Sequence, residues 1–218
     1  MNKYLLILLL LSVSACSQKV EKENSNAELP FYEEASFTPH WFEVDNELPE
    51  DFHKIPEFSL INQFGETVTE KVVEDKIFIV DFFFASCSGI CPKLTTNMSL
   101  VQEAFLNDDE IILLSHSVTP TLDTPRVLKA FGKTKGVVEG KWHLLTGDRN
   151  QIYDLGRNYY FIEEDLGLEK NPDEFIHTEN LLLVDQNRNI RGIYNGLNRT
   201  SVNHLIEDIK KLKKKVSS

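Results

Sequence analysis

Two cysteines stand four positions apart, directly after an apolar and aromatic run. The stretch reads DFFFASCSGICPKL over residues 81–94, and it contains Cys87, Cys91 and Pro92. The continuous apolar run predicts a buried central strand, and the proline predicts the first turn of a helix. A cysteine pair at such a junction can form a structural disulfide, a redox catalyst or part of a metal site. The spacing alone leaves all three open.

The rest of the chain predicts alternating strands and helices, from apolar runs, turn residues and helical spacing. In chain order we expect a hairpin around 62–65, a strand over 76–84, a helix from Pro92, a strand over 110–118, helices near 124–131 and 150–160 with a short strand at 142–147 between them, strands over 180–186 and 190–196, and a helix from about Ser201. This order indicates an α/β thioredoxin-like sandwich with a central mixed β-sheet, an N-terminal hairpin extension and helical insertions.

On that fold both sulfurs lie near the N-terminus of a helix. Unpaired backbone N–H groups and the helix dipole lower the pKa of a thiol there and favour the thiolate, which is both a nucleophile and a soft metal ligand. A structural disulfide stays open, although closing so short a loop would constrain little of the unfolded chain. Asp81 in the preceding strand is either a partly buried carboxylate that tunes thiol protonation or an exposed strand residue.

A histidine supplies the third candidate group. Thiol–disulfide enzymes of the thioredoxin class carry a cis-proline, usually followed by threonine, just before the penultimate strand. Here that place reads EFIHTENLLLVD, with His177 in the proline position and Thr178 after it. Two thiolates and one imidazole form a three-coordinate soft site suited to copper, especially Cu(I). His116, at the end of the second strand, is either an extra ligand or an ordinary hydrogen-bonded histidine.

Over roughly residues 53–214 the sequence resembles the Sco/SenC family of copper chaperones. FFFASCSGICP is similar to the family's strand followed by C-x-x-x-C-P, and the histidine before NLLLVD takes the family's histidine position. SVTPTLDTPRVLKAF and WHLLTG are similar to the family segments S-V-D-P-x-x-D-T-P-x-x-L and W-x-x-L-T-G. One position departs, because Thr119 stands where the family usually has aspartate, whereas Asp123 matches the later aspartate.

The resemblance implies copper, as Cu(I) and/or Cu(II), held by Cys87, Cys91 and His177. It implies a metallochaperone, not an enzyme, that delivers copper to the binuclear copper site of cytochrome c oxidase during its assembly. The expected partners are the copper-bearing oxidase subunit and an upstream periplasmic copper donor or thiol reductant. A thiol–disulfide oxidoreductase that keeps the oxidase copper-site cysteines reduced is the alternative, with Cys87 attacking and Cys91 resolving. The histidine favours the first reading, because dithiol exchange does not need an imidazole.

The N-terminus predicts export. One lysine, a short apolar run and small residues precede Cys16 in MNKYLLILLLLSVSAC, and this run is too short to span a membrane. VSAC is similar to the bacterial lipobox, which implies a signal peptide over 1–15 and a lipid on Cys16. The polar residues that follow predict a flexible tether over 16–52, with the domain over 53–218. We therefore expect a bacterial lipoprotein anchored to a membrane with its domain facing the periplasm.

The charge of the chain argues against nucleic acid as a partner. The net charge is −11, whereas binding to a phosphate backbone requires a basic face. The one basic run, KKLKKK over 210–215, is typical of the solvated end of a final helix.

Overall fold

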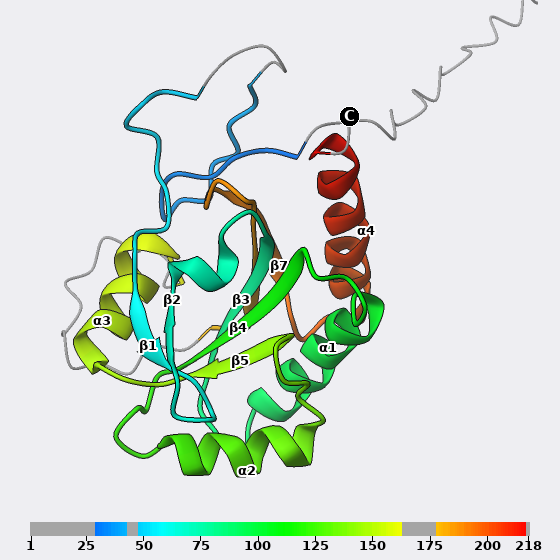
Figure 1. The fold of residues 1–218 in the computed structure, drawn as a ribbon. Coiled ribbons are helices and arrows are strands. Elements are labelled where there is room, and N and C mark those ends of the chain that lie inside the picture. The colour runs from blue at the N-terminus through cyan, green and yellow to red at the C-terminus, as the bar shows by residue number, and fades with distance from the viewer. Residues whose placement is uncertain (1–28, 43–47, 163–177, 217–218) are drawn as a thin grey trace, which may run out of the picture.

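A five-stranded mixed sheet forms the centre of the molecule in the computed structural model, which describes residues 29–42, 48–162 and 178–216 (Figure 1). The strand order is β5-β4-β3-β6-β7, in which β3, β4 and β5 are parallel and β6 runs antiparallel to both of its neighbours. The strands are β3 (Ile77–Phe83), β4 (Ile111–Ser117), β5 (Trp142–Leu145), β6 (Asn180–Val184) and β7 (Ile190–Asn195). A separate hairpin of β1 (Ser59–Ile61) and β2 (Thr67–Thr69) precedes them.

Helices and the hairpin cover the two faces of this sheet. The helices are α1 (Cys91–Ala104), α2 (Pro125–Lys135), α3 (Arg149–Asp154) and α4 (Arg199–Val216), with a 3-10 turn η1 (Glu70–Val73) and a π-helical turn η2 (Leu155–Tyr159). One apolar core joins the sheet to α1, α2 and α4, and a second joins it to the hairpin, η1 and α3. Figure 1 shows α3 and the hairpin on the side away from α1 and α4.

The sequence pattern explains the central strands. Every residue of β3 and β4 is buried, so both faces of these strands pack against other elements. Such strands read as continuous apolar runs instead of alternating ones. The two exceptions in those runs are polar, Asp81 in β3 and the Ser115–Ser117 segment in β4, and they lie toward the carboxyl ends of the strands.

Local signals also set the helix boundaries. Thr124 caps α2 by accepting a hydrogen bond from the backbone of Val127, with Pro125 in the first turn. Gly136 ends α2 with φ of 72°, a left-handed conformation that glycine adopts without strain. In α4 the buried side chains recur at helical spacing, and they are Val202, Leu205, Ile209 and Leu212.

The predicted fold class is confirmed, and the expected elements are present close to their predicted bounds. Helix α1 begins at Cys91, one residue before the predicted Pro92, and α4 begins at Arg199. Within the described part, packing begins at Leu29, ahead of residue 53, because the backbone of Tyr32 pairs with that of Ile190 in β7. The division of the whole chain into signal, tether and domain stays a prediction.

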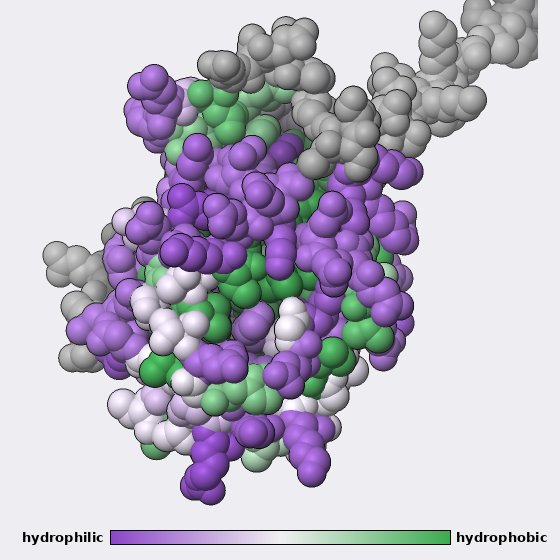
Figure 2. All heavy atoms as spheres, in the orientation of Figure 1, coloured by the Kyte–Doolittle hydropathy of each residue, from purple (hydrophilic) through white to green (hydrophobic). Residues whose placement is uncertain are grey.

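The face of the molecule drawn in Figure 2 is mostly hydrophilic. Figure 2 shows polar and charged residues over most of this face, with apolar residues in small groups between them. The predicted basic run lies at the end of α4, where Lys213 bridges to Asp108 and Glu110 near the start of β4. In the described ranges, no helix is both long and apolar enough to cross a bilayer.

Candidate metal and redox site

The cysteine loop, residues 84–90, connects the central strand β3 to α1. Cys91 is the first residue of α1 and is buried, whereas Cys87 in the loop is partly exposed. Both are free thiols. The structure therefore places the cysteine pair where the sequence predicted it, at the carboxyl end of a central strand and the N-terminus of a helix.

The two thiols have different acidities. Burial acts to raise the pKa of Cys87, but hydrogen bonds from the Cys91 thiol and from the backbone of Cys91, Gly89 and Ile90 outweigh it, so this pKa is lowered. Burial raises the pKa of Cys91 to about 12, and the neighbouring Cys87 and Asp81 act in the same direction. Cys87 is thus the thiol that becomes a thiolate first, and it is also the more accessible one.

A buried carboxylate lies in the strand below the cysteines. Asp81 is 1% exposed and accepts a hydrogen bond from Ser115 in β4, whose hydroxyl in turn accepts one from Trp142 Nε1 at 2.8 Å. Burial raises the pKa of Asp81 to about 7, although the hydrogen bond from Ser115 opposes it. Asp81 is therefore a buried carboxylate and not an exposed strand residue. The partners Ser115 and Trp142 were not predicted as parts of this site.

His116 faces the other side of the sheet. Its ring stacks on Phe82 with centroids 4.9 Å apart and also contacts the rings of Phe58 and Tyr160. Burial lowers the pKa of His116 to about 3, although a contact with the backbone of Asp81 opposes the shift. His116 is therefore a buried histidine on the face of the sheet opposite Cys91, and not an extra ligand beside the cysteines.

The third predicted ligand, His177, lies outside the described residues. The next residue, Thr178, is described, and its hydroxyl accepts a hydrogen bond from the backbone of Asn180 at the start of β6. Since β6 runs antiparallel beside β3, its start lies at the same edge of the sheet as the end of β3 and the cysteine loop. Across the described part of the chain, no group of three or more His, Cys, Asp and Glu side chains is arranged to hold a metal ion.

These features define a thioredoxin-like protein with a dithiol at the end of its central strand. The SCO1/SenC family model matches residues 46–214, which is most of the chain, and the protein therefore belongs to the SCO1/SenC family. The SCO1 protein homolog of Bacillus subtilis is 26% identical over 163 residues, covering 72% of this chain and 82% of that protein.

Solved structures agree with this assignment. A SCO1/SenC family lipoprotein from Bacillus anthracis is 29% identical with a TM-score of 0.65, covering 74% of this chain and 95% of that chain. BsSco, a cytochrome c oxidase assembly protein of the Sco family in which a disulfide switch was identified, is 26% identical with a TM-score of 0.63, covering 74% and 94%. Copper-bound ScoI from Arabidopsis thaliana shares the fold at 24% identity, with a TM-score of 0.56 and coverage of 72% and 98%.

Proposed function

We propose that this protein is a copper metallochaperone that binds copper through Cys87, Cys91 and His177. The observation that carries the proposal is the pair of free thiols at the carboxyl end of β3, beside the start of the strand that His177 precedes by three residues. Two soft sulfur ligands and an imidazole suit copper, and a site of three protein ligands suits Cu(I) in particular.

The chemistry of binding follows from the two thiols. Copper binds to thiolates, so its binding releases the protons of Cys87 and Cys91. The lowered pKa of Cys87 favours its thiolate, whereas the pKa of Cys91 is raised by burial, and a bound cation would oppose that effect. Cys87 is therefore the sulfur more readily available as a thiolate ligand, whereas Cys91 must lose its proton when it binds.

We propose the copper-bearing subunit of cytochrome c oxidase as the acceptor, with its binuclear copper site filled during assembly. Support comes from family membership and from BsSco, which is described as an oxidase assembly protein. A periplasmic copper donor or thiol reductant would act upstream, because copper can bind only to the dithiol form.

A second candidate function is thiol–disulfide exchange that keeps the oxidase cysteines reduced. The observation in its favour is the asymmetry of the pair, in which Cys87 is accessible with a lowered pKa and Cys91 is buried with a raised one. An accessible attacking thiol and a buried resolving thiol are what such exchange requires.

We also propose that Cys16 carries a lipid and anchors the domain on the exported side of a bacterial membrane. Support comes from the apolar run and VSAC at the N-terminus. Replacing Cys16 by serine should move the protein out of the membrane fraction of cells. Membrane fractionation identical to that of the native protein would refute the anchor.

An anaerobic Cu(I) titration of native protein, His177→Ala and Cys87→Ser tests the delivery function. We expect one copper per native chain, weaker retention by His177→Ala and loss of the site in Cys87→Ser. His204→Ala is the matched control, because His204 is exposed on α4 and should change nothing.

The same variants in cells separate the two candidate functions. Under the delivery function, His177→Ala impairs assembly of the oxidase copper centre at limiting copper, and added copper partly restores it by mass action. Cys87→Ser should not be rescued. If cells with His177→Ala assemble the oxidase copper centre fully at limiting copper while the cysteine variants fail, the delivery function is wrong and thiol–disulfide exchange is the function instead.

A further inference from the structure

A buried carboxylate, Asp123, ties the loop after β4 to the cysteine loop. Asp123 is 2% exposed, and its Oδ2 atom accepts three hydrogen bonds. The donors are the backbone N–H of Ala85 at 3.0 Å, the hydroxyl of Ser117 at 2.6 Å and the hydroxyl of Thr119 at 3.0 Å. One oxygen therefore joins the end of β4 to the first residues of the segment that carries Cys87.

The residues next to this bond contact both cysteines. The carbonyl of Phe84 accepts a hydrogen bond from the backbone N–H of Cys87 at 3.3 Å. The Ala85 N–H and the Phe84 carbonyl belong to one peptide unit, so the bond to Asp123 fixes the carbonyl that accepts from the backbone N–H of Cys87. The same residue, Phe84, contacts the Cys91 thiol through its backbone.

Thr119 completes this arrangement. Its hydroxyl donates to Asp123, and its backbone N–H donates to the hydroxyl of Ser117 at 3.2 Å. An ionised aspartate at position 119 would offer no hydrogen to Asp123, whereas the hydroxyl of threonine does.

We propose that Asp123, with Thr119 as its donor, is a positioning residue that holds the cysteine loop in the geometry needed for the dithiol to act. For copper binding this inference rests on the proposed function, whereas for disulfide formation it does not. Asp123 itself is not a ligand, because it acts through the backbone of Ala85. Its loss should change sulfur chemistry beyond its effect on stability.

The test uses two readouts on the full chain and a matched control. The first readout is Cu(I) affinity, measured by competition with a chromophoric chelator. The second is the equilibrium between dithiol and disulfide in glutathione buffer. There the Cys87 and Cys91 thiols give up two electrons and two protons and form one S–S bond, while the S–S bond of oxidised glutathione breaks to yield two glutathione thiols.

Asp123→Asn is compared with Asp185→Asn. Asp185 is also a buried carboxylate that accepts backbone hydrogen bonds in a turn, from Asn187 and Asn189, but it lies at the other end of the sheet. We expect Asp123→Asn to lower both the Cu(I) affinity and the disulfide-to-dithiol ratio about ten-fold, which corresponds to 1.4 kcal/mol. Asp185→Asn should leave both at the native value, whatever it does to the melting temperature.

Thr119→Val provides a milder variant that keeps a branched side chain and removes one donor. It should lower both readouts roughly three-fold, the size expected for a single hydrogen bond. If Asp123→Asn does not fold, Thr119→Val alone tests the positioning role of Asp123. Native readouts in Thr119→Val and in any folded Asp123→Asn protein would overturn the positioning role. If native protein binds no copper, the proposed function fails, and the glutathione equilibrium alone then decides the role of Asp123.

Discussion

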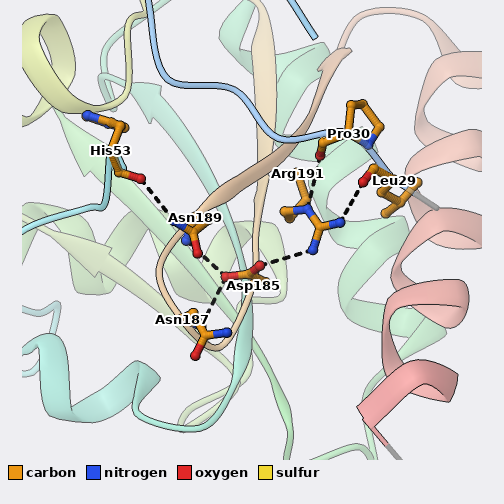
Figure 3. Close-up of polar contacts among 7 residues, drawn as sticks. All are labelled: Leu29, Pro30, His53, Asp185, Asn187, Asn189 and Arg191. Carbon is orange, nitrogen blue, oxygen red and sulfur yellow. Dashed lines mark hydrogen bonds and ion pairs between the residues drawn. The ribbon is translucent and has the colours of Figure 1, made fainter. Parts of the chain in front are cut away.

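The two ends of strand β3 show opposite ways of using buried polar groups. Near its start, at the end of β6, lies the Asp185–Arg191 cluster, in which Arg191 is 5% exposed and bridges to Asp185 at 3.1 Å (Figure 3). At its other end, seven residues and about 20 Å away, lies the cysteine loop. The Asp185–Arg191 end holds the N-terminal segment against the sheet, and the other end carries the sulfurs of Cys87 and Cys91.

The Asp185–Arg191 cluster satisfies its charges from several directions. Arg191 donates to the backbone carbonyls of Leu29 and Pro30 at 2.6 and 3.0 Å, and its guanidinium lies 3.6 Å from the centroid of the Phe31 ring. Asp185 accepts from two backbone N–H groups of the turn between β6 and β7. The cluster therefore fixes the N-terminal segment against the sheet, and its charges compensate one another.

The cysteine end is built differently. Its buried acid, Asp81, has a neutral hydroxyl as its donor, and burial raises its pKa to about 7. The raised pKa of Cys91 has the same origin. Burial raises the pKa of Asp185 as well, but there the cation of Arg191 and the backbone donors oppose the shift, whereas only neutral donors oppose it at Asp81. The two ends of the sheet therefore differ in whether a cation faces the buried acid.

Removing Arg191 should have the largest effect on stability. In Arg191→Met the Asp185 carboxylate stays buried without its cation, and the N-terminal segment loses two hydrogen bonds. Breaking one partner of a buried ion pair costs about 3–5 kcal/mol. Urea unfolding should show this loss with Cu(I) affinity unchanged, and Lys210→Ala, which removes an exposed ion pair with Glu207, should change stability little. If Arg191→Met were as stable as native protein, the Asp185–Arg191 cluster would not stabilise the fold.

The acid at the cysteine end should make stability depend on pH. The unfolded chain releases the Asp81 proton with a pKa of 3.8, whereas the folded protein holds it up to about pH 7. The contribution of Asp81 is therefore most favourable below about pH 4, declines as pH rises and is fully lost above about pH 7. Asp81→Asn should remove this slope and be more stable than native protein above pH 7, by up to about 4 kcal/mol. The free energy of unfolding is measured for both proteins between pH 4 and 8. The same dependence on pH in Asp81→Asn and native protein would contradict the role of Asp81.

A smaller effect should follow from a single neutral contact near the Asp185–Arg191 cluster. The side-chain amide of Asn189 donates to the backbone carbonyl of His53 at 2.9 Å, which ties the β6–β7 turn to the segment before the hairpin. Asn189→Ala leaves that carbonyl without this donor and should cost about 1–2 kcal/mol. Thermal unfolding of the variant measures the cost, and the dithiol equilibrium in glutathione should stay at its native value. If Asn189→Ala lost as much stability as Arg191→Met, the ion pair would not be the main source of the stability that the Asp185–Arg191 cluster provides.

The sequence predicted much of the fold, because its strands and helices have strong local signals. Continuous apolar runs predicted β3 and β4, and the run of residues before Pro92 predicted that the cysteine pair lies between β3 and α1. The polar contacts that support the site were not predicted. Ser115 lies 34 residues from Asp81, and Arg191 lies 162 residues from Leu29, so only the three-dimensional fold brings these groups together.

His116 shows a further limit of local reasoning. Its position at the end of a strand suggested either a ligand or a hydrogen-bonded histidine. Successive strand residues point to opposite faces, and His116 faces the core that contains Phe82 and Phe58, not the α1 side that carries Cys91. The sequence places a histidine near the end of β4, but only the register of β4 against β3 decides which face it occupies.

X-ray absorption of the copper-loaded native protein tests the central claim most directly. The account predicts two sulfur ligands, with copper–sulfur distances near the roughly 2.3 Å of metal thiolates, and one imidazole nitrogen. Cys87→Ser should lose one sulfur from the spectrum, and His177→Ala should lose the imidazole while keeping both sulfurs. A copper spectrum with only nitrogen and oxygen ligands, or one that neither substitution changes, would contradict the proposed site.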